Sequence, residues 1–466
     1  MTSSQRQLFG TDGIRGVAGD FPLTRESVFL IGTALGRDLR KNAPDRHAVR
    51  VVIGQDTRES SAWIADRLTL GLTSQGIEVH SAGILTTPGV AYLARSRGYS
   101  AGIVISASHN PWMDNGIKVF SHDGYKFPDA RELEVEKEIF ALIQDQRPEP
   151  QVHPTPASSL PGEESLRREY IDWLAAGVSA DLSKLKVLVD CAHGAAAAEA
   201  PELFCKLRIP ATILHASPTG KNINDACGAL HAAAVGRALV ERKAERKSEN
   251  FDLGVTFDGD ADRALFCDAE GRGVNGDAVL LLAARDMQSR GTLANATVVA
   301  TAMSNMGLEI ALKRSGIRML RANVGDKYVL EEMRKTGATL GGEQSGHILF
   351  RDADATTGDG LATALRVMEV IVRSGKPLAE LVADLKVFPQ VIKNIRVREK
   401  TPFVQVPQIQ NAIQAAENSL NGNGRVVVRY SGTEALARVM VEAESEDMMK
   451  SLADSIAASI QTALGV

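Results

Sequence analysis

The sequence predicts an α/β protein in which three similar α/β domains are followed by a smaller C-terminal α+β domain. Three observations lead to this prediction. Short β-branched runs alternate with helical patterns, which is the rhythm of parallel α/β units. Five prolines interrupt that rhythm between 147 and 161. Beyond Gly375-Lys376-Pro377 the order of the expected elements changes.

The first domain is expected to cover residues 1–156. Its expected strands and helices alternate up to the proline-rich stretch. Proline cannot continue a helix and favours an extended linker, so this stretch separates the first domain from the second. We expect strands at 50–53, 77–80 and 101–105, and helices at 61–72 and 89–95.

The same rhythm returns twice after the linker, which predicts a second domain over 157–264 and a third over 265–380. In the second we expect strands at 186–190, 211–215 and 253–257, and a helix at 195–206. In the third we expect strands at 297–301 and 318–324, and helices at 277–288, 307–314, 328–334 and 360–373.

The last domain, 381–466, is expected to follow a different order. Its predicted elements alternate as β-α-β-β-α, which is typical of a small α+β domain. They are strands at 391–398, 425–429 and 437–442, and helices at 406–420 and 446–464.

Composition excludes several classes of protein. The chain has 466 residues, of which 44% are apolar and 24% charged, as in ordinary globular proteins. A net charge of −4 and only 5% aromatic residues argue against nucleic-acid binding. No apolar run reaches the roughly 18 residues of a membrane span, and no apolar signal segment opens the sequence. The four cysteines form no CxxC pair, which argues against a zinc cluster or disulfide framework and fits a cytoplasmic location.

The strongest chemical signal is a loop directly after a predicted strand, in which three carboxylates alternate. Asp258, Asp260 and Asp262 would point the same way in an extended segment, and a bound cation would relieve their repulsion. Oxygen ligands suit Mg²⁺. A calcium EF-hand is excluded, because Arg263 and Ala269 stand where that loop needs glycine and glutamate. An acidic surface turn is the remaining alternative.

Two serines follow the predicted strand at 101–105. Ser106 and Ser108 are candidate nucleophiles, since open α/β sheets place their ligands at the carboxyl ends of strands. The segment lacks the GxSxG pattern of a nucleophile elbow, so acyl hydrolysis is disfavoured. A turn built from Ser, Asn and Pro is an equally good interpretation of the local sequence.

The other candidates lie in three polar loops, each of which is by itself also compatible with a structural turn. The first loop, Glu343-Gln344-Ser345-Gly346-His347, has groups that bind hydroxyls or move a proton. The second loop, Arg429-Tyr430-Ser431-Gly432-Thr433, has a guanidinium fork and backbone N–H groups suited to phosphate. The third loop, the segment 10–16 around Arg15, is glycine-rich but lacks the ending of a P-loop.

Taken together, these five segments resemble the α-D-phosphohexomutase superfamily in order and spacing over essentially the whole chain. The segments 9–16, 222–224, 303–309 and 324–329 resemble the branch that acts on glucosamine phosphates. The resemblance implies mixed sheets in the α/β domains and a central cleft to which each of the four domains contributes a loop.

The resemblance also implies an isomerase that depends on Mg²⁺. Its reaction would interconvert glucosamine 6-phosphate and glucosamine 1-phosphate through a phosphoserine and a bound glucosamine 1,6-bisphosphate, and would supply UDP-N-acetylglucosamine for cell-wall synthesis. Its partner would be a hexosamine phosphate, and a homodimer is a family-level expectation. The alternatives are a phosphomannomutase or phosphoglucomutase of the same fold, a Mg²⁺-dependent sugar-phosphate phosphatase, and a non-catalytic binder.

By the same resemblance, Ser108 carries the phosphoryl group and completes the magnesium site with Asp258, Asp260 and Asp262. Arg263 would lie near the transferring phosphoryl group. Supporting electrostatic or acid–base roles would belong to Arg15, Lys118 and His347. The residues expected to contact the substrate are His109, Glu343, Ser345, Arg429, Ser431, Gly432 and Thr433.

Two residues depart from the pattern of the branch. Ala261 stands in the metal loop where glycine is common, so the backbone there is expected to avoid positive φ. Ala435 follows the phosphate loop where proline is common, which is expected to loosen that loop. Neither change removes a liganding group, and phosphate affinity is the property that they would affect.

Overall fold

The computed structural model describes residues 7–10, 12–43, 48–145, 164–245, 250–351, 355–431 and 435–466. The chain divides into two compact units. The first consists of Met1–Met303 and Met319–Val382, and the second of Ser304–Arg318 and Ala383–Val466. No helix in the described ranges is long and apolar enough to cross a membrane.

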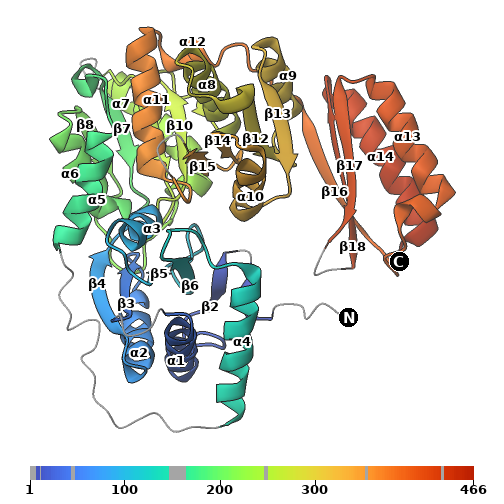
Figure 1. The fold of residues 1–466 in the computed structure, drawn as a ribbon. Helices are drawn as coiled ribbons and strands as arrows, with labels where there is room; N and C mark the ends of the chain where they lie inside the picture. The colour runs from blue at the N-terminus through green and yellow to red at the C-terminus, as the bar shows by residue number, and fades with distance from the viewer. Residues whose placement is uncertain are drawn as a thin grey trace. The chain divides into compact units, whose positions relative to one another are not determined.

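The first sheet of the first unit has six strands in the order β1-β2-β6-β5-β3-β4 (Figure 1). It is mixed, because β3 pairs in parallel with β4 and β5, whereas β5–β6, β6–β2 and β2–β1 are antiparallel. The strands are β1 (Phe9–Gly10), β2 (Gly13–Val17), β3 (Arg50–Gln55), β4 (Glu78–Ile84), β5 (Ala101–Ile105) and β6 (Asp114–Ser121). The helices are α1 (Arg25–Lys41), α2 (Ser61–Ser74), α3 (Thr87–Ser96) and α4 (Asp129–Gln144).

Helices α1, α2 and α4 bury apolar side chains against one face of this sheet in a single core. The first two approach closely because small residues lie at their contact. A Cβ added at Gly71 of α2 would lie 2.2 Å from the carbonyl oxygen of Phe29 in α1, so a larger residue would force the helices apart. Helix α3 instead packs on β3 and β5 without joining that core.

Two further sheets complete the first unit. The second has the order β11-β10-β9-β7-β8 and the third the order β13-β12-β14-β15. Both mix parallel and antiparallel pairs. The strands are β7 (Val187–Asp190), β8 (Ala211–Leu214), β9 (Leu253–Phe257), β10 (Ala264–Asp268), β11 (Gly273–Val274), β12 (Thr297–Thr301), β13 (Arg318–Ala322), β14 (Leu340–Gly342) and β15 (Ile348–Phe350). The helices are α5 (Glu164–Ala176), α6 (Ala196–Lys206), α7 (Ala233–Glu245), α8 (Gly276–Ser289), α10 (Asp326–Thr336), α11 (Gly360–Ser374) and α12 (Leu378–Leu381).

The second unit is built on an antiparallel sheet in the order β16-β18-β17. Apolar side chains of its strands and of two long helices form its core. The short helix α9 (Met306–Arg314) also belongs to this unit, where Asn305 donates to the carbonyl oxygen of Phe388 at 3.0 Å. The other elements are β16 (Gln390–Arg396), α13 (Pro407–Leu420), β17 (Gly424–Tyr430), β18 (Leu436–Ala443) and α14 (Glu446–Leu464).

The fold class predicted from the sequence is confirmed: three mixed sheets with helices accompany a smaller C-terminal sheet. The exact domain boundaries stay a prediction. The helix expected at 307–314 was placed in the third α/β domain, and the structure groups it with the C-terminal strands. The first helix, α1, and the strand β6 were not predicted.

One buried acid fixes the start of α3, which borders the site described below. Glu199 of α6 is fully buried, and its carboxyl group accepts the backbone N–H of Thr86 at 2.7 Å and the Thr86 hydroxyl at 3.0 Å. Thr86 in turn caps α3. Burial disfavours the carboxylate and raises the pKa of Glu199 to about 8.

This raised pKa predicts a pH dependence of stability. Between the usual value near 4.5 and about 8, the folded chain binds more protons at Glu199 than the unfolded chain, so stability falls as the pH rises through this window. Glu199→Gln, whose amide oxygen can accept a hydrogen bond from Thr86 without carrying a charge at any pH, should lack this loss. Its melting temperature should exceed that of the parent protein at pH 9, with a smaller difference at pH 5.

The matched control is Glu241→Gln, on an exposed position of α7. It should melt like the parent protein at both pH values. Melting curves of Glu199→Gln that follow the parent equally at pH 5 and pH 9 would contradict the role of this acid.

Candidate functional site

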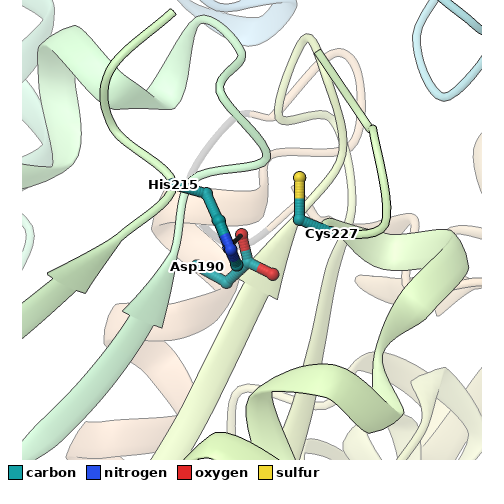
Figure 2. A group of neighbouring side chains, drawn as sticks. All are labelled: Asp190, His215 and Cys227. Carbon is teal, nitrogen blue, oxygen red and sulfur yellow. Dashed lines mark hydrogen bonds and ion pairs between the residues drawn. The ribbon is translucent and has the colours of Figure 1, made fainter. Parts of the chain in front are cut away.

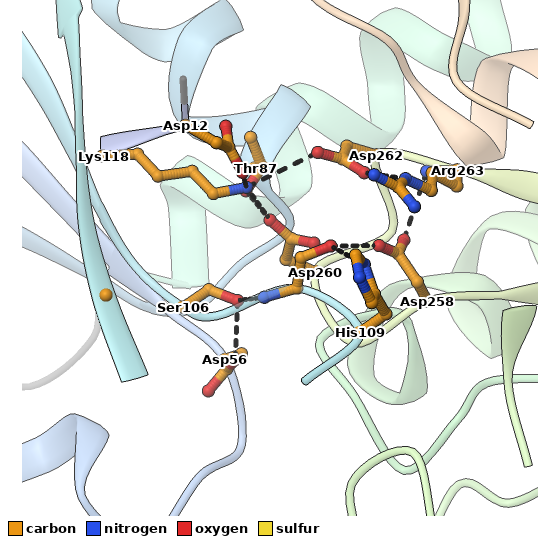
Figure 3. A network of polar contacts seen from close by, with 12 residues as sticks. Asp12, Asp56, Thr87, Ser106, His109, Lys118, Asp258, Asp260, Asp262 and Arg263 are labelled. Carbon is orange, nitrogen blue, oxygen red and sulfur yellow. Dashed lines mark hydrogen bonds and ion pairs between the residues drawn. The ribbon is translucent and has the colours of Figure 1, made fainter. Parts of the chain in front are cut away.

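A cavity of about 430 Å³ lies in the first unit, lined by parts of five segments. Three of them are the loops after β5, β9 and β14, at strand ends of the kind where open α/β sheets place their ligands. The other two are the β1–β2 segment and the segment 324–326 at the start of α10. Figure 3 shows the polar network at the base of the cavity. The structure therefore brings together several residues that the sequence analysis singled out, since the cavity lining includes Arg15, His109, Asp262, Arg263, Glu343 and His347.

Ser108 lies in the loop after β5, in the left-handed region with a φ of 53°. Its Oγ donates to Oδ2 of Asp258 at 2.5 Å and lies 3.2 Å from Nδ1 of His109. Ser106 has a different role, since its Oγ donates to Asp56 at 2.7 Å and accepts the N–H of Ser108 at 2.9 Å. Ser106 therefore holds the loop, and Ser108 presents its hydroxyl to the carboxylates.

Two buried donors, to neither of which the sequence assigned a role, hold the same loop by its carbonyl oxygens. The guanidinium of Arg58, paired with Asp56 at 2.8 Å, donates to the carbonyls of Ser108 and Asn110 at 2.9 and 2.8 Å. The amide of Asn224 donates to the same two carbonyls at 2.9 and 3.1 Å. Forked donors on both carbonyls oppose rotation of the loop, which stabilises the left-handed conformation of Ser108.

The three predicted carboxylates lie on the loop after β9 and are all buried. One oxygen atom from each lies within 4.8 Å of the others. Within the part of the chain that the structure describes, no group donates a hydrogen bond to the buried Oδ1 of Asp260 or Oδ1 of Asp262. Buried oxygens of this kind need a partner, so the loop fits a hard cation with oxygen ligands.

The expectation for Ala261 was wrong. Its φ is 53°, in the left-handed region that the sequence analysis expected an alanine to avoid. Two hydrogen bonds hold it there: its N–H donates to the carbonyl of Asp258 at 3.1 Å, and its carbonyl accepts the N–H of Gly360 at 2.9 Å. A non-glycine residue in this region costs roughly 1 to 2 kcal/mol, and these tertiary contacts offset the cost.

A buried lysine from the first sheet lies against the carboxylates. Nζ of Lys118, in β6, lies 2.7 Å from Asp260, 3.5 Å from Asp262 and 3.0 Å from Asp12. Figure 3 shows its side chain reaching from the sheet to the loop. Burial disfavours the ammonium, but these carboxylates raise the pKa of Lys118, so it stays charged. Thr87 at the start of α3 also donates its hydroxyl to Asp260.

The surroundings shift the pKa values of two of these carboxylates in opposite directions. Burial and the neighbouring Asp262 and Asp260 raise the pKa of Asp258 well above its usual value. Burial acts the same way on Asp262, but Lys118 and His347 outweigh it and hold its pKa well below the usual value. Asp258, which contacts Ser108, is therefore less compensated by positive charge than Asp262.

Cations also surround His109, beside the serine. Burial, together with Arg263 and Arg15, lowers the pKa of His109 to about 4. The imidazole is therefore neutral at pH 7. Arg15 itself pairs with Asp12, and Nε of Arg263 lies 3.7 Å from Asp262, so both guanidinium groups stand beside carboxylates at the cavity.

The turn between β14 and β15 brings further predicted residues to the cavity. Glu343 accepts the N–H of Gly325 at 3.1 Å, and the buried Oγ of Ser345 has no hydrogen-bond partner among the described residues. Nε2 of His347 accepts the N–H of Gly358 at 2.9 Å. An unpartnered hydroxyl and a carboxylate on one turn suit a ligand that carries hydroxyl groups.

Two carboxylates flank the ring of His347. Asp262 lies 3.7 Å from Nδ1 and Asp326 lies 3.7 Å from Nε2. Burial lowers the pKa of this imidazole, but the two carboxylates outweigh burial and raise it. His347 therefore takes up a proton more readily than an ordinary histidine, in contrast to His109.

The predicted phosphate loop belongs to the second unit. Arg429 is exposed on β17, and the N–H of Ser431 donates to the carbonyl of Leu436 at 2.8 Å. Lys400, which the sequence analysis missed, donates to the carbonyl of Ser431 at 2.7 Å. Gly432 and Thr433 lie outside the described residues. The phosphate-binding role of this loop therefore stays a prediction.

Comparison with protein families shows matches along the whole chain. The three alpha/beta/alpha domains of the phosphoglucomutase/phosphomannomutase family match residues 6–146, 168–271 and 275–388, and its C-terminal domain matches 392–459. A phosphoglucosamine mutase of Koribacter versatilis (strain Ellin345) is 60% identical, over 100% of this chain and 99% of its own. That of Solibacter usitatus (strain Ellin6076) is 50% identical, over 99% of each chain.

Solved structures share the fold. A phosphoglucomutase/phosphomannomutase family protein from Burkholderia thailandensis has a TM-score of 0.76 at 24% identity, covering 98% of this chain and 99% of its own. The Aspergillus fumigatus N-acetylphosphoglucosamine mutase, in complex with GlcNAc-6P and magnesium, has a TM-score of 0.66 at 20% identity, covering 100% and 97%. At such identities the likeness concerns the fold.

The contacts of Arg58 predict a specific effect of Arg58→Lys. Lysine keeps a charge beside Asp56 but lacks the forked donors, so the carbonyls of Ser108 and Asn110 should lose hydrogen bonds. Because each such bond contributes about 1 kcal/mol or more, we expect amides of the segment 106–111 to exchange hydrogen at least about tenfold faster. Hydrogen exchange followed by mass spectrometry measures this.

The control is Arg168→Lys, in an exposed ion pair with Glu164. It should leave exchange in the segment 106–111 unchanged. Equal exchange rates in the two variants would show that Arg58 does not hold the serine loop.

Proposed function

The chain belongs to the phosphoglucomutase/phosphomannomutase family, and on that premise we propose that it is an isomerase that interconverts glucosamine 6-phosphate and glucosamine 1-phosphate. The observation that carries the proposal is the contact of the Ser108 hydroxyl with the buried Asp258, 2.5 Å away, on a loop with two more carboxylates. The choice of an amino sugar is supported by the phosphoglucosamine mutases among its relatives.

In the proposed reaction Ser108 carries a phosphoryl group. The bond between phosphorus and Oγ of Ser108 breaks as a new bond forms to the free hydroxyl of the sugar phosphate, which gives glucosamine 1,6-bisphosphate. The bisphosphate then returns its other phosphoryl group to Oγ, and the phosphate has changed ends. Added glucosamine 1,6-bisphosphate would phosphorylate a free Ser108 by the second step, so it would act as an activator.

We propose that Asp258, Asp260 and Asp262 hold Mg²⁺ together with an oxygen of the phosphorylated Ser108. The two buried oxygens without hydrogen bonds fit this assignment. A bound Mg²⁺ would supply positive charge next to the phosphoryl group. The magnesium in the fungal mutase structure is consistent with it.

Cationic side chains of the protein would supply the remaining positive charge around the phosphoryl group. This matters because phosphoryl transfer depends mainly on positioning and charge stabilisation. Lys118 stays an ammonium among its carboxylates, so it would balance charge and would not accept a proton. Arg263 and Arg15 line the cavity and would bind phosphoryl oxygens. His109, neutral at pH 7, would contact the substrate beside Ser108.

The sugar would be bound by the turn after β14. The carboxylate of Glu343 would accept hydrogen bonds from sugar hydroxyls, and the hydroxyl of Ser345 would donate to or accept from them. His347 would supply a proton or a positive charge. The loop Arg429–Thr433 of the second unit would hold the phosphate that is not reacting. A cytoplasmic location and a homodimer stay predictions.

Turnover of glucosamine 6-phosphate tests the proposal. ³¹P NMR of the protein with Mg²⁺ and a trace of glucosamine 1,6-bisphosphate should show a growing glucosamine 1-phosphate signal and no inorganic phosphate. Inorganic phosphate in its place would mean a phosphatase. Equal or faster turnover of glucose or mannose phosphates would mean a mutase for neutral hexoses.

Removal of the proposed nucleophile is the next test. Ser108→Ala should lower the rate at least about a thousand-fold, the order of loss seen when a nucleophile is removed, while the circular dichroism spectrum stays that of the parent. Ser419→Ala, at an exposed position of α13, is the control and should keep full activity. Activity of Ser108→Ala within a few-fold of the parent would exclude the phosphoserine.

Substitution in the carboxylate loop tests the metal site. Asp260→Asn keeps the shape of the side chain and removes one negative charge, so the Mg²⁺ concentration that gives half-maximal activity should rise about tenfold or more. A magnesium titration of the initial rate measures this. Asp447→Asn, exposed at the start of α14, should leave the titration unchanged. An unchanged titration in Asp260→Asn would place the metal elsewhere.

A further inference from the structure

A second cluster of metal-ligating side chains lies at the carboxyl end of the second sheet, and it shares no residue with the cavity lining. Asp190 ends β7, His215 directly follows β8, and Cys227 lies in the loop that leads toward α7. Figure 2 shows the carboxylate and the imidazole side by side, with the thiol next to them. One ligand atom from each residue lies within 4.8 Å of the others.

The distance between the carboxylate oxygen and the imidazole nitrogen is close to that between two ligand atoms on one metal ion. Oδ1 of Asp190 lies 3.0 Å from Nδ1 of His215, and ligand atoms on a tetrahedral zinc are about 3.3 to 3.8 Å apart, given bonds of about 2.0 to 2.3 Å. Asp190 and Cys227 are buried, whereas the His215 side chain is 38% exposed, which leaves a way in from solvent. The ring of His193 packs edge-on against that of His215, with the ring centroids 5.2 Å apart.

The carboxylate is already oriented by its surroundings. Asp190 accepts the N–H of Ala192 and the N–H of Gly228, each at 2.9 Å, on its two different oxygens. A carboxylate has about four acceptor sites, so these bonds and the contact with His215 leave one free. Hydrogen bonds of this kind hold a ligand in place in established metal sites. Because Gly228 is the neighbour of Cys227, the same contacts fix the loop that carries the thiol.

A nucleophilic Cys-His-Asp triad is the competing interpretation of these three residues. It requires a thiolate that a substrate can reach, and the Cys227 thiol is fully buried. A metal ion, in contrast, deprotonates the thiol that it binds.

We propose that Asp190, His215 and Cys227 bind a thiophilic divalent cation of the Zn²⁺ class, with water in the fourth position. Thiol and imidazole ligands favour Zn²⁺ over Mg²⁺, whereas the all-oxygen set of Asp258, Asp260 and Asp262 favours Mg²⁺. The absence of a CxxC pair argued against a zinc cluster in the sequence. The sheet order brings the ligands together from three separate segments instead.

Such an ion would stabilise the loop that supports the proposed nucleophile. Asn224, three residues before Cys227, donates to the carbonyls of Ser108 and Asn110, and its own N–H donates to the carbonyl of Ala192 at 2.9 Å. The site would therefore be structural. It would hold the segment between β8 and α7 in the conformation that positions the serine loop.

Metal content of the full-length protein tests the proposal. The protein is stripped with a chelator, loaded with Zn²⁺ in the presence of a large excess of Mg²⁺, gel-filtered and analysed by mass spectrometry for zinc. We expect one Zn²⁺ per chain in the parent and in Cys205→Ser, which removes an exposed cysteine. Cys227→Ser and His215→Ala should bind zinc at least about a hundredfold more weakly, the size of effect seen when metal sites lose key contacts.

Cobalt gives a second measurement that needs no variant to fold. Co²⁺ added to the parent protein in excess Mg²⁺ should produce a thiolate-to-cobalt charge-transfer band in the near ultraviolet. Absence of that band would overturn the proposal. So would zinc that is not retained in excess Mg²⁺, or zinc that Cys227→Ser retains as tightly as the parent. None of these measurements depends on mutase activity, so they test the metal site independently of the proposed function.

Discussion

Three carboxylates buried together on one short loop are the constraint on which the rest of the first unit depends. Like charges in a medium of low dielectric constant repel strongly, and such a loop is stable only beside positive charge. Lys118, itself buried, supplies part of it at 2.7 Å from Asp260. Because the lysine comes from β6 of the first sheet and the loop from β9 of the second, this ion pair requires the two sheets to pack as they do. Asp258 is thereby left facing Ser108 with its charge less compensated than that of Asp262.

The parts of the fold that could be predicted are those whose local sequence and tertiary surroundings agree. The buried parallel strands are continuous β-branched runs, so β3, β5, β7, β9 and β12 were expected at nearly their observed positions. Strand β6 was not, because it begins Asp114-Asn115-Gly116, residues that favour turns. Antiparallel pairing with β5 and β2 on its two sides imposes the extended conformation there. This matters for function, since β6 carries Lys118.

The residues of the candidate site were likewise only partly predictable from the sequence. The carboxylate loop could be predicted because its members are neighbours in sequence, and their pattern alone signals a cation. Arg58 and Asn224 could not, since each is a single polar residue far from Ser108 along the chain, and only the sheet order brings them to its carbonyl oxygens. The left-handed Ala261 shows the limit of local propensity, because a hydrogen bond from the distant Gly360, together with one inside the loop to Asp258, overrides it. The role of Arg429 still rests on resemblance.

The central claim is that Ser108, placed against the carboxylate loop, passes a phosphoryl group to the sugar and recovers one from it. Protein phosphorylated with ³²P on Ser108 and mixed with unlabelled glucosamine 6-phosphate in a rapid-quench instrument tests this in a single turnover. The account predicts that the label leaves the protein and appears in sugar phosphate, at least as fast as steady-state turnover and without inorganic phosphate. Label that stays on the protein while the sugar isomerises, or that leaves as inorganic phosphate, would contradict it.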